Sequence, residues 1–268
     1  EILDLEPIEE YELINIKKVL ENSLNYRRKC GAIMFDTPYS KLSFVDGEVY
    51  FDKYESTSAH KLVSEAMILM GFVISDFLIK NKIPAPFRSQ KINCDANEIL
   101  RKNSSSLIKF SILKQFIGRS FISIKPNNHE TLGLKSYTQV TAPLRRYLDL
   151  IVQKQIYLFL NKYPLIKEKE IDNLINEYKS KLREVNEIIK ENKLIYLIKF
   201  FNKKNNELFK IIFIRWVNPK KNIALVYFPQ YYLEILIKLY ISYDTYPNKV
   251  YKVKYNENLQ SNLLEFIN

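Results

Sequence analysis

The sequence has 268 residues, of which 47% are hydrophobic, so the chain can fill a sizeable core and lacks the composition of a disordered protein. Lysine and arginine outnumber aspartate and glutamate by 41 to 30, and the formal net charge of +11 favours a polyanionic partner. The two cysteines, Cys30 and Cys94, lack the spacing of a zinc site or a disulfide scaffold.

The first third of the chain predicts two helices separated by a β-hairpin. Apolar residues at helical spacing indicate an amphipathic helix over residues 8–29. The pair Asp46-Gly47 stands between alternating apolar residues, which is a strong hairpin signal. A long helix with few polar residues is predicted over 59–81, and we expect it to be largely buried.

We expect a cytoplasmic protein that is not inserted in a membrane. The longest apolar run lies in the second helix, is interrupted by Ser75 and Asp76, and is shorter than a bilayer span requires. No signal peptide is recognisable at the start of the sequence. A further short helix is predicted over 107–118.

The stretch YTQVTAPLRRYLDL, residues 137–150, places two arginines at the predicted start of a helix. Thr141 suits an N-cap and Pro143 suits a first turn, so the helix is predicted to begin near Ala142 or Pro143. Arginines are unfavourable in a first turn unless an anion binds there, so Arg145 and Arg146 suggest a phosphate site. In the alternative, Arg145 pairs with Asp149 and Arg146 points into water.

The last part of the chain changes from helical to strand periodicity. A second long helical region is predicted over 165–204, and strands are predicted over 208–217, 223–228 and 249–255. The fold class is therefore α+β, with long helices and a β-hairpin followed by a small all-β module. We place the boundary between the two domains, 1–204 and 205–268, at this change of period.

The basic residues concentrate in the later part of the chain. Residues 1–55 contain 7 basic and 12 acidic side chains, whereas residues 190–221 contain 9 basic and 2 acidic ones. Cations between aromatic rings are typical of surfaces that bind single-stranded nucleic acid, although a lysine-rich surface over ordinary core aromatics has the same composition. The aromatic residues of this segment are Tyr196, Phe200, Phe201, Phe209, Phe213 and Trp216.

Three stretches together resemble the RNB family, the RNase II and RNase R type of processive 3′ to 5′ exoribonuclease. They are LGLKSYTQVTAPLRRYLDLIVQK, RRKCGAIMFDTPYSKLSF and AHKLVSEAMILMG. The resemblance implies that residues 1–204 are the C-terminal portion of an RNB-like ribonuclease domain and that 205–268 form a small OB-type RNA-binding barrel. The sequence departs from the family pattern at Ala142, where serine is usual, at Leu148, where proline often occurs, and at Gln153, where histidine is common.

The resemblance also implies roles for individual residues. Arg145 matches the family arginine that contacts the phosphate at the scissile end of RNA, and Arg146 would support the site or the RNA backbone. Glu65 matches a glutamate that helps to hold the terminal nucleotide; the alternative is a buried structural carboxylate paired with a nearby arginine. Tyr137 would lie on the strand that enters the site. Further RNA contacts are predicted at Thr141, Trp216, Lys220 and Lys221.

Family members hydrolyse phosphodiesters with magnesium held by a close cluster of aspartates, whereas the aspartates of this chain are scattered singly. We therefore expect the Mg²⁺ ligands to lie outside this chain, which alone would be inactive. The implied function is the RNA-binding portion of a monomeric exoribonuclease that degrades single-stranded RNA to nucleoside monophosphates. A non-catalytic RNA-binding module and a purely structural helical protein are the alternatives, and neither His60 nor His129 is assigned a catalytic role.

Overall fold

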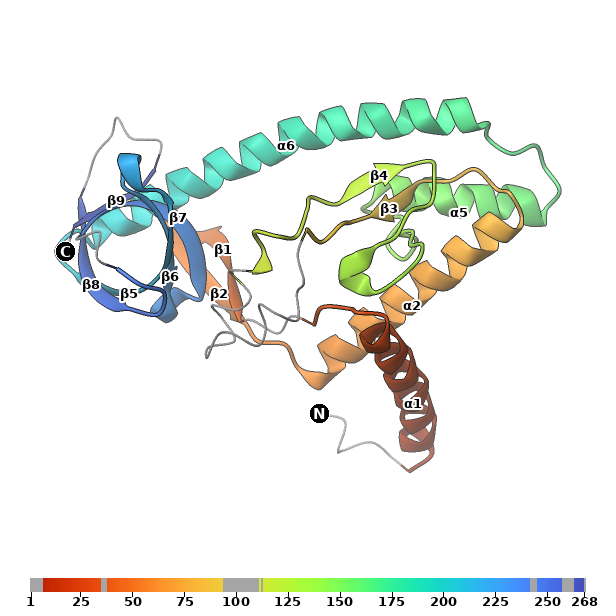
Figure 1. Cartoon of the computed structure of the whole chain (residues 1–268), viewed down its shortest axis with the longest axis horizontal. Helices are drawn as coiled ribbons and strands as arrows, with labels where there is room; N and C mark the ends of the chain where they lie inside the picture. The colour runs from red at the N-terminus through yellow and green to blue at the C-terminus, as the bar shows by residue number, and fades with distance from the viewer. Residues whose placement is uncertain are drawn as a thin grey trace. The chain divides into compact units, whose positions relative to one another are not determined.

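The computed structural model describes residues 7–34, 38–93, 111, 113–241, 245–256 and 263–267, and these form two compact units (Figure 1). The first unit contains α1 (Pro7–Lys29), α2 (Ser58–Lys80), α5 (Tyr147–Leu160), the short strands β3 (Phe87–Ser89) and β4 (Phe121–Ser123), and the 3-10 turn η1 (Glu130–Leu132). The second unit contains a β-hairpin and a closed β-barrel. Helix α6 (Glu168–Lys203) contributes residues to both units. The predicted α+β class is confirmed, and the predicted boundary between residues 204 and 205 stays a prediction.

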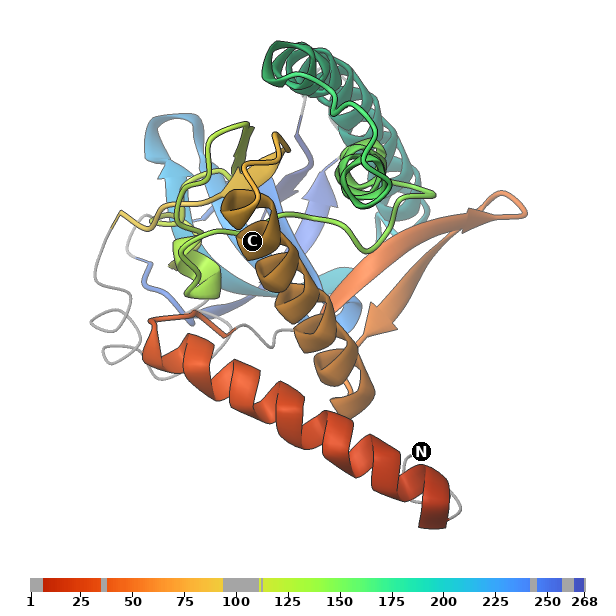
Figure 2. The ribbon, with the colours of Figure 1, turned by 90° about the vertical axis from the view of Figure 1, so that its right-hand side faces the viewer.

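Helices α1 and α2 pack against each other in the first unit (Figure 2). The apolar periodicity over 8–29 correctly predicted α1. Thr57 caps α2 because its Oγ1 accepts the N–H of His60, while the His60 ring accepts the N–H of Thr57. Residues 107–110 and 112 of the predicted short helix over 107–118 lie outside the described residues, whereas Ser111 and Leu113 are helical and residues 114–116 form a turn.

The prediction that α2 is largely buried is wrong. Its buried residues are Glu65, Gly71, Ser75 and Leu78, whereas Val63, Met70 and Val73 are about half exposed. The helix is also long and apolar enough to cross a membrane by length and composition, a test that the core helix of a soluble protein passes as well. The expectation that the apolar segment is too short to span a bilayer therefore fails, and the absence of membrane association stays a prediction.

Gly71 of α2 allows the chain after η1 to approach the helix closely. The N–H of Thr138 donates to the carbonyl of Gly71 across 3.3 Å. A Cβ at position 71 would collide with the ring of Tyr137 and with the carbonyl oxygen of Thr138. This contact fixes the position of the segment that leads to the two arginines.

The barrel of the second unit consists of β5 (Leu208–Asn218), β6 (Ile223–Phe228), β7 (Leu233–Tyr240), β8 (Val250–Asn256) and β9 (Glu265–Ile267). The strands close in the order β5-β6-β7-β9-β8, with β7 and β9 parallel and all other neighbours antiparallel. Sequence periodicity predicted β5, β6 and β8 but missed β7 and β9. The short 3-10 turns η2 (Pro219–Lys221) and η3 (Pro229–Tyr231) join β5 to β6 and β6 to β7.

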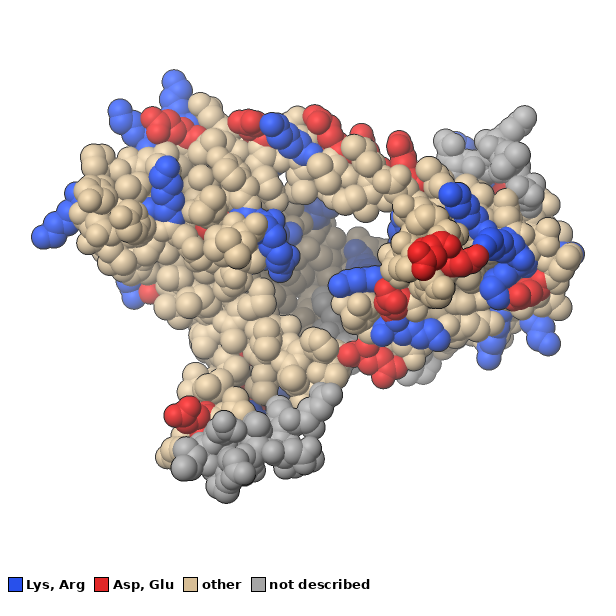
Figure 3. All heavy atoms as spheres, turned by 180° about the vertical axis from the view of Figure 1, so that it is seen from behind, with Lys and Arg blue, Asp and Glu red and all other residues tan. Residues whose placement is uncertain are grey.

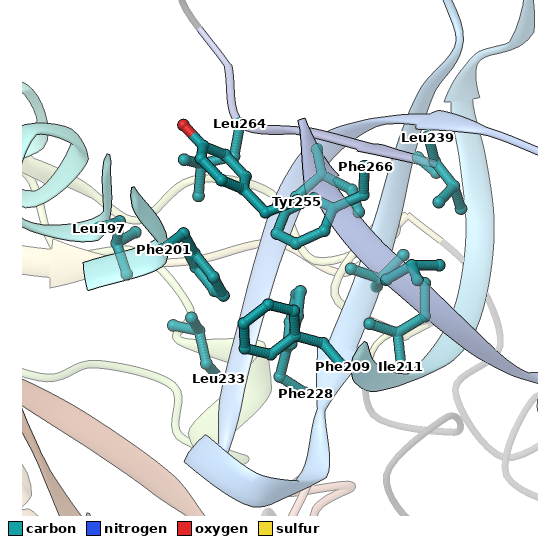
Figure 4. Close-up of a cluster of buried hydrophobic side chains, with 14 of the residues drawn as sticks. Leu197, Phe201, Phe209, Ile211, Phe228, Leu233, Leu239, Tyr255, Leu264 and Phe266 are labelled. Atoms are coloured by element: carbon teal, nitrogen blue, oxygen red, sulfur yellow. The ribbon is translucent and has the colours of Figure 1, made fainter. Parts of the chain in front are cut away.

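Aromatic side chains fill the barrel (Figure 4). Phe201 of α6 is fully buried and packs edge-on against Phe209 and Phe266, with ring centroids 5.0 and 5.1 Å apart. Such pairs add ~0.5–1.5 kcal/mol beyond the area that they bury. The end of α6 is thereby anchored to the barrel core.

The predicted hairpin is confirmed as β1 (Tyr39–Val45) and β2 (Glu48–Tyr54). Asp46 and Gly47 both have positive φ, 49° and 84°, as a two-residue hairpin turn requires. Leu42 and Phe51 pack against the barrel core, and Ser40 donates to the carbonyl of Tyr231. The hairpin thus belongs to the same compact unit as the barrel.

Candidate functional site

The two arginines lie in a turn before α5, not in the helix. Helix α5 begins at Tyr147, and Arg146 is its N-cap residue with extended backbone angles. The carbonyl of Ala142 accepts the N–H groups of both Arg145 and Arg146, which closes a separate turn over residues 142–146. The predicted helix start near Ala142 or Pro143 is therefore wrong.

Thr141 does not cap the helix as predicted. Its Oγ1 accepts a hydrogen bond from Nη2 of Arg146 across 3.0 Å, and the N-cap position is occupied by Arg146, five residues later, without a side-chain cap. Thr141 thus helps to hold Arg146. Its predicted contact with RNA stays a prediction.

The buried side chain of Asp149 stabilises the turn. Its side chain is 1% exposed, and its Oδ2 lies 2.6 Å from Nη2 of Arg146 and accepts the N–H of Ala142 across 2.9 Å. Gln153, one helical turn later, donates to the carbonyl of Val140 across 2.8 Å. Two side chains on one face of α5 therefore fix the backbone that leads into the turn.

Residue spacing suggested an ion pair between Arg145 and Asp149, whereas the structure contains one between Arg146 and Asp149. Arg146, three residues before Asp149, forms the pair, and Arg145, four residues before it, does not. The reason is that Arg145 precedes the helix, so the i,i+4 geometry of a continuous helix does not apply.

Arg145 is exposed, and its guanidinium makes no hydrogen bond or ion pair within the part of the chain that the structure describes. The adjacent Leu144 is completely exposed, so the tip of the turn projects into solvent. An anion could bind Arg145 without displacing a carboxylate. This makes Arg145 the better candidate of the two for contact with a phosphate.

Tyr137 lies outside any helix or strand, so the expected strand is absent at this residue. Its carbonyl accepts the N–H of Arg88, and its ring meets that of His129 edge-on at 5.5 Å. Burial raises the pKa of the Tyr137 hydroxyl, while the positive charges of Arg146 and Arg88 oppose that shift. The hydroxyl is therefore a neutral hydrogen-bond donor near two arginines.

Sequence reasoning did not identify Arg88. Its Nη1 donates to Oε1 of Gln139 and its Nη2 to Oγ of Ser120, each across 2.8 Å. These bonds tie β3 to the segment that carries Tyr137. An isolated arginine after Pro86 offered no spacing signal that could have revealed this role.

Glu65 is a buried carboxylate bound by an arginine, as the structural alternative supposed. Both of its oxygens accept hydrogen bonds from Arg27 of α1, and Oε1 also accepts the hydroxyl of Ser23 across 2.7 Å. Arg27 also donates to the carbonyl of Leu132 across 3.0 Å. The pair joins α1, α2 and η1, and a contact between Glu65 and RNA stays a prediction.

The aromatic residues of segment 190–221 mostly form core contacts. Phe201, Phe209 and Phe213 are buried, and Tyr196 stacks on Phe44 of the hairpin. Trp216 is partly buried, and its indole N–H donates to Thr245 across 3.1 Å. Most of these rings therefore belong to the hydrophobic core, as the alternative of a lysine-rich surface over core aromatics supposed.

Lys220 and Lys221 are exposed in η2, where a helical turn ends at Asn222 with positive φ. The acidic and basic side chains of α6 are interspersed along the helix (Figure 3). The predicted role of the two lysines in RNA binding stays a prediction.

A model of the RNB domain matches residues 6–162, which is more than half of the chain. The chain belongs to the RNB family. A ribonuclease of Synechocystis, itself uncharacterized, is 26% identical over 238 residues, which are 88% of this chain and 36% of that protein. The mitochondrial exoribonuclease II of Saccharomyces cerevisiae is 36% identical over 141 residues, which are 48% of this chain and 14% of the yeast protein. The chain thus spans about a third or less of the length of these relatives.

Solved structures of RNB-family exoribonucleases have the same fold. An active-site mutant of the Dss1 exoribonuclease of Candida glabrata matches with a TM-score of 0.82 at 21% identity, over 99% of this chain and 36% of that one. RNase R of Mycoplasma genitalium in complex with ribose-methylated single-stranded RNA matches with a TM-score of 0.72 at 16% identity, over 95% of this chain and 49% of that one.

The described residues do not fit a magnesium site of the kind expected for an RNB nuclease. They include no group of three or more histidine, cysteine, aspartate or glutamate side chains that could hold a metal ion. Asp149, the aspartate nearest the arginine turn, is already bound to Arg146 and Ala142. No step of a metal-dependent reaction can therefore be assigned to these residues.

Proposed function

We propose that this RNB-family chain is the RNA-binding portion of a 3′ to 5′ exoribonuclease that hydrolyses single-stranded RNA to nucleoside monophosphates. Arg145 contacts the phosphate at the scissile end of the RNA and neutralises charge that develops on its oxygens during hydrolysis. Residues outside this chain supply the Mg²⁺ ligands.

The observation that carries this proposal is the contrast between the two arginines. Arg146 is held by Asp149 and Thr141, whereas Arg145 is exposed and unpaired within the described residues. A turn whose backbone is fixed by buried side chains and whose tip presents an unpaired guanidinium is suited to a preorganised phosphate contact.

The second unit adds the RNA-binding barrel. Its five closed strands agree in number with an OB-type barrel, a fold that binds oligonucleotides. The basic balance of the chain, with a net charge of +11, suits a polyanion. A cytoplasmic location and a monomeric state are further parts of the proposal.

The experiment is incubation of this chain with single-stranded RNA labelled at the 3′ end or the 5′ end, with magnesium and with EDTA, beside a binding titration at two salt concentrations. We expect binding that weakens with salt, because phosphate contacts release counterions, and no cleavage. Progressive loss of nucleotides from the 3′ end that EDTA abolishes would show that the carboxylates of this chain form a metal site after all.

A second candidate is a non-catalytic RNA-binding module derived from the same family. It is favoured by the absence of a metal-ligand group among the described residues. The two candidates differ in the complete protein, where only the exoribonuclease loses turnover when Arg145 is replaced.

A further inference from the structure

The outer face of the β5–β8 strand pair carries three lysines with no acidic residue between them. Lys210 of β5 lies directly opposite Lys252 of β8, and Lys254 is the next residue of β8 on the same face, opposite Leu208. All three lysines are exposed, while the residues that alternate with them, Phe209, Ile211 and Val253, are buried in the barrel. We call Lys210, Lys252 and Lys254 the lysine ladder.

The lysine ladder is electrostatically unfavourable in the isolated barrel. Like charges directly opposite each other on neighbouring strands destabilise a sheet. None of the three forms an ion pair with a carboxylate of the described residues. The described acidic residues beside the two strands have other partners, since Glu207 binds Lys204 and Glu265 binds Lys238. A polyanion bound across the strand pair would remove the repulsion.

Aromatic rings lie at one end of the same strand pair. Lys249, just before β8, lies over the ring of Tyr246 at 5.5 Å and over that of Tyr251 at 5.3 Å. Tyr246 is 62% exposed, so its side chain is accessible to a base. Lysines beside an exposed ring form the combination that single-stranded nucleic acids bind, because phosphates need cations and unstacked bases need rings.

The opposite strand pair lacks these properties. OB-type barrels bind oligonucleotides through their second and third strands, which are β6 and β7 here. On the outer face of β6 and β7, Leu225 faces Leu236 and Tyr227 faces Glu234. Glu234 is bound by Ser111 and Lys114, and Lys238 is bound by Glu265. This face therefore offers no unpaired cation for a phosphate among the described residues.

We infer that single-stranded RNA binds the barrel along the outer face of β5 and β8, with its phosphates on the lysine ladder and a base on Tyr246. The inference rests on the proposed RNA-binding function and locates the contact on the strand pair away from the usual OB surface. The lysine ladder thus contributes to the RNA affinity of the second unit.

The test measures binding of an oligouridylate of about 16 nucleotides, the upper end of the site size of one OB barrel, to the 268-residue chain over a range of salt concentrations. One variant carries Lys210→Gln, Lys252→Gln and Lys254→Gln. The control carries Lys167→Gln, Lys169→Gln and Lys181→Gln, which remove the same charge from exposed positions in or just before α6.

We expect the lysine-ladder variant to bind about tenfold more weakly at physiological salt and to lose about 2 units of salt slope, since each phosphate contact of a single strand contributes ~0.7. The control should change the slope by less than ~0.5. Equal losses in the two variants would show an effect of net charge alone and would overturn the inference. Unchanged binding by the lysine-ladder variant would also overturn the inference, but it would leave the proposed RNA-binding function standing. A wild-type chain without salt-sensitive binding would refute the proposed function itself.

A further variant separates lost binding from lost folding. Lys210→Glu replaces a repulsive cross-strand pair with an attractive one, so the thermal midpoint should rise while RNA affinity falls. A rise in the midpoint with unchanged affinity would contradict the inference, because the barrel would then be folded, altered at the ladder and still able to bind.

Discussion

Arg145 and Arg146 are neighbours in the sequence and have opposite surroundings. Arg146 lies against the buried carboxylate of Asp149 and the hydroxyl of Thr141, whereas Arg145 is exposed. Breaking a buried ion pair by removing one partner costs ~3–5 kcal/mol, so Arg146 is poorly suited to release its partner for RNA. Arg145 can meet a phosphate at no such cost.

The sequence could identify this arginine pair but could not distinguish its members. Resemblance and spacing marked Arg145 and Arg146 as candidate phosphate ligands. Which of them Asp149 binds depends on where α5 begins, and helix starts are set by turn geometry that residue periodicity does not contain. Arg27, the partner of Glu65, lies 38 residues away in sequence and could not be assigned for the same reason.

Burial of His129 makes stability depend on pH. Burial, with the charge of Arg88, lowers the pKa of His129 from 6.5 to about 4. Between these values the unfolded chain binds a proton that the folded chain does not, so stability falls as the pH is lowered from about 7 to about 4 and this contribution is constant below that. At 1.36 kcal/mol per pKa unit, the loss is about 3 kcal/mol.

The measurement is urea unfolding at several pH values for wild type, His129→Gln and, as a control, His60→Gln. We expect His129→Gln to flatten the pH dependence between 6.5 and 4 and the exposed His60 variant to retain it. An unchanged slope in His129→Gln would show that other groups cause the dependence.

At the scale of elements, the apolar periodicity of the sequence predicted the long and regular helices and strands. Helix α1, helix α6, the hairpin and strands β5, β6 and β8 follow from apolar spacing and from Asp46-Gly47. Strand β9 has three residues and pairs in parallel with β7, so it depends on contacts distant in sequence. The exposure of α2 was missed because apolar composition does not reveal which face has a neighbour.

Gly71 allows a test of the close contact between α2 and segment 137–138. Alanine in a helix interior is ordinarily ~1 kcal/mol more stable than glycine. At position 71, however, a methyl group would collide with Tyr137 and with a backbone oxygen, and such overpacking costs ~1–3 kcal/mol. We expect Gly71→Ala to lower the free energy of unfolding, measured in urea, because a backbone oxygen cannot move aside cheaply.

Ser64→Ala, on an exposed position of α2, is the control for helix propensity and should raise stability by a few tenths of a kcal/mol at most. A stability gain in Gly71→Ala equal to the ordinary difference between the two residues would show that the contact with segment 137–138 is loose.

At the scale of the whole molecule, the candidate residues are divided between the two compact units. Arg145, Tyr137 and Glu65 belong to the first unit, and the lysine ladder belongs to the second. The chain spans 36% of its Synechocystis relative, and its described residues lack a metal-ligand group. We propose that this chain contacts the phosphate and binds RNA, and that residues outside it bind the metal.

The most direct test of this assignment is the turnover and RNA affinity of the complete protein carrying Arg145→Ala, with the exposed Arg28→Ala of α1 as control. Because the role proposed for Arg145 is to stabilise charge that develops in the transition state, we predict a fall in kcat of about 100-fold or more, with a thermal midpoint equal to that of wild type and only a modest loss of affinity. The control should leave kcat unchanged. A variant that keeps wild-type turnover, or that loses affinity alone, would contradict the account.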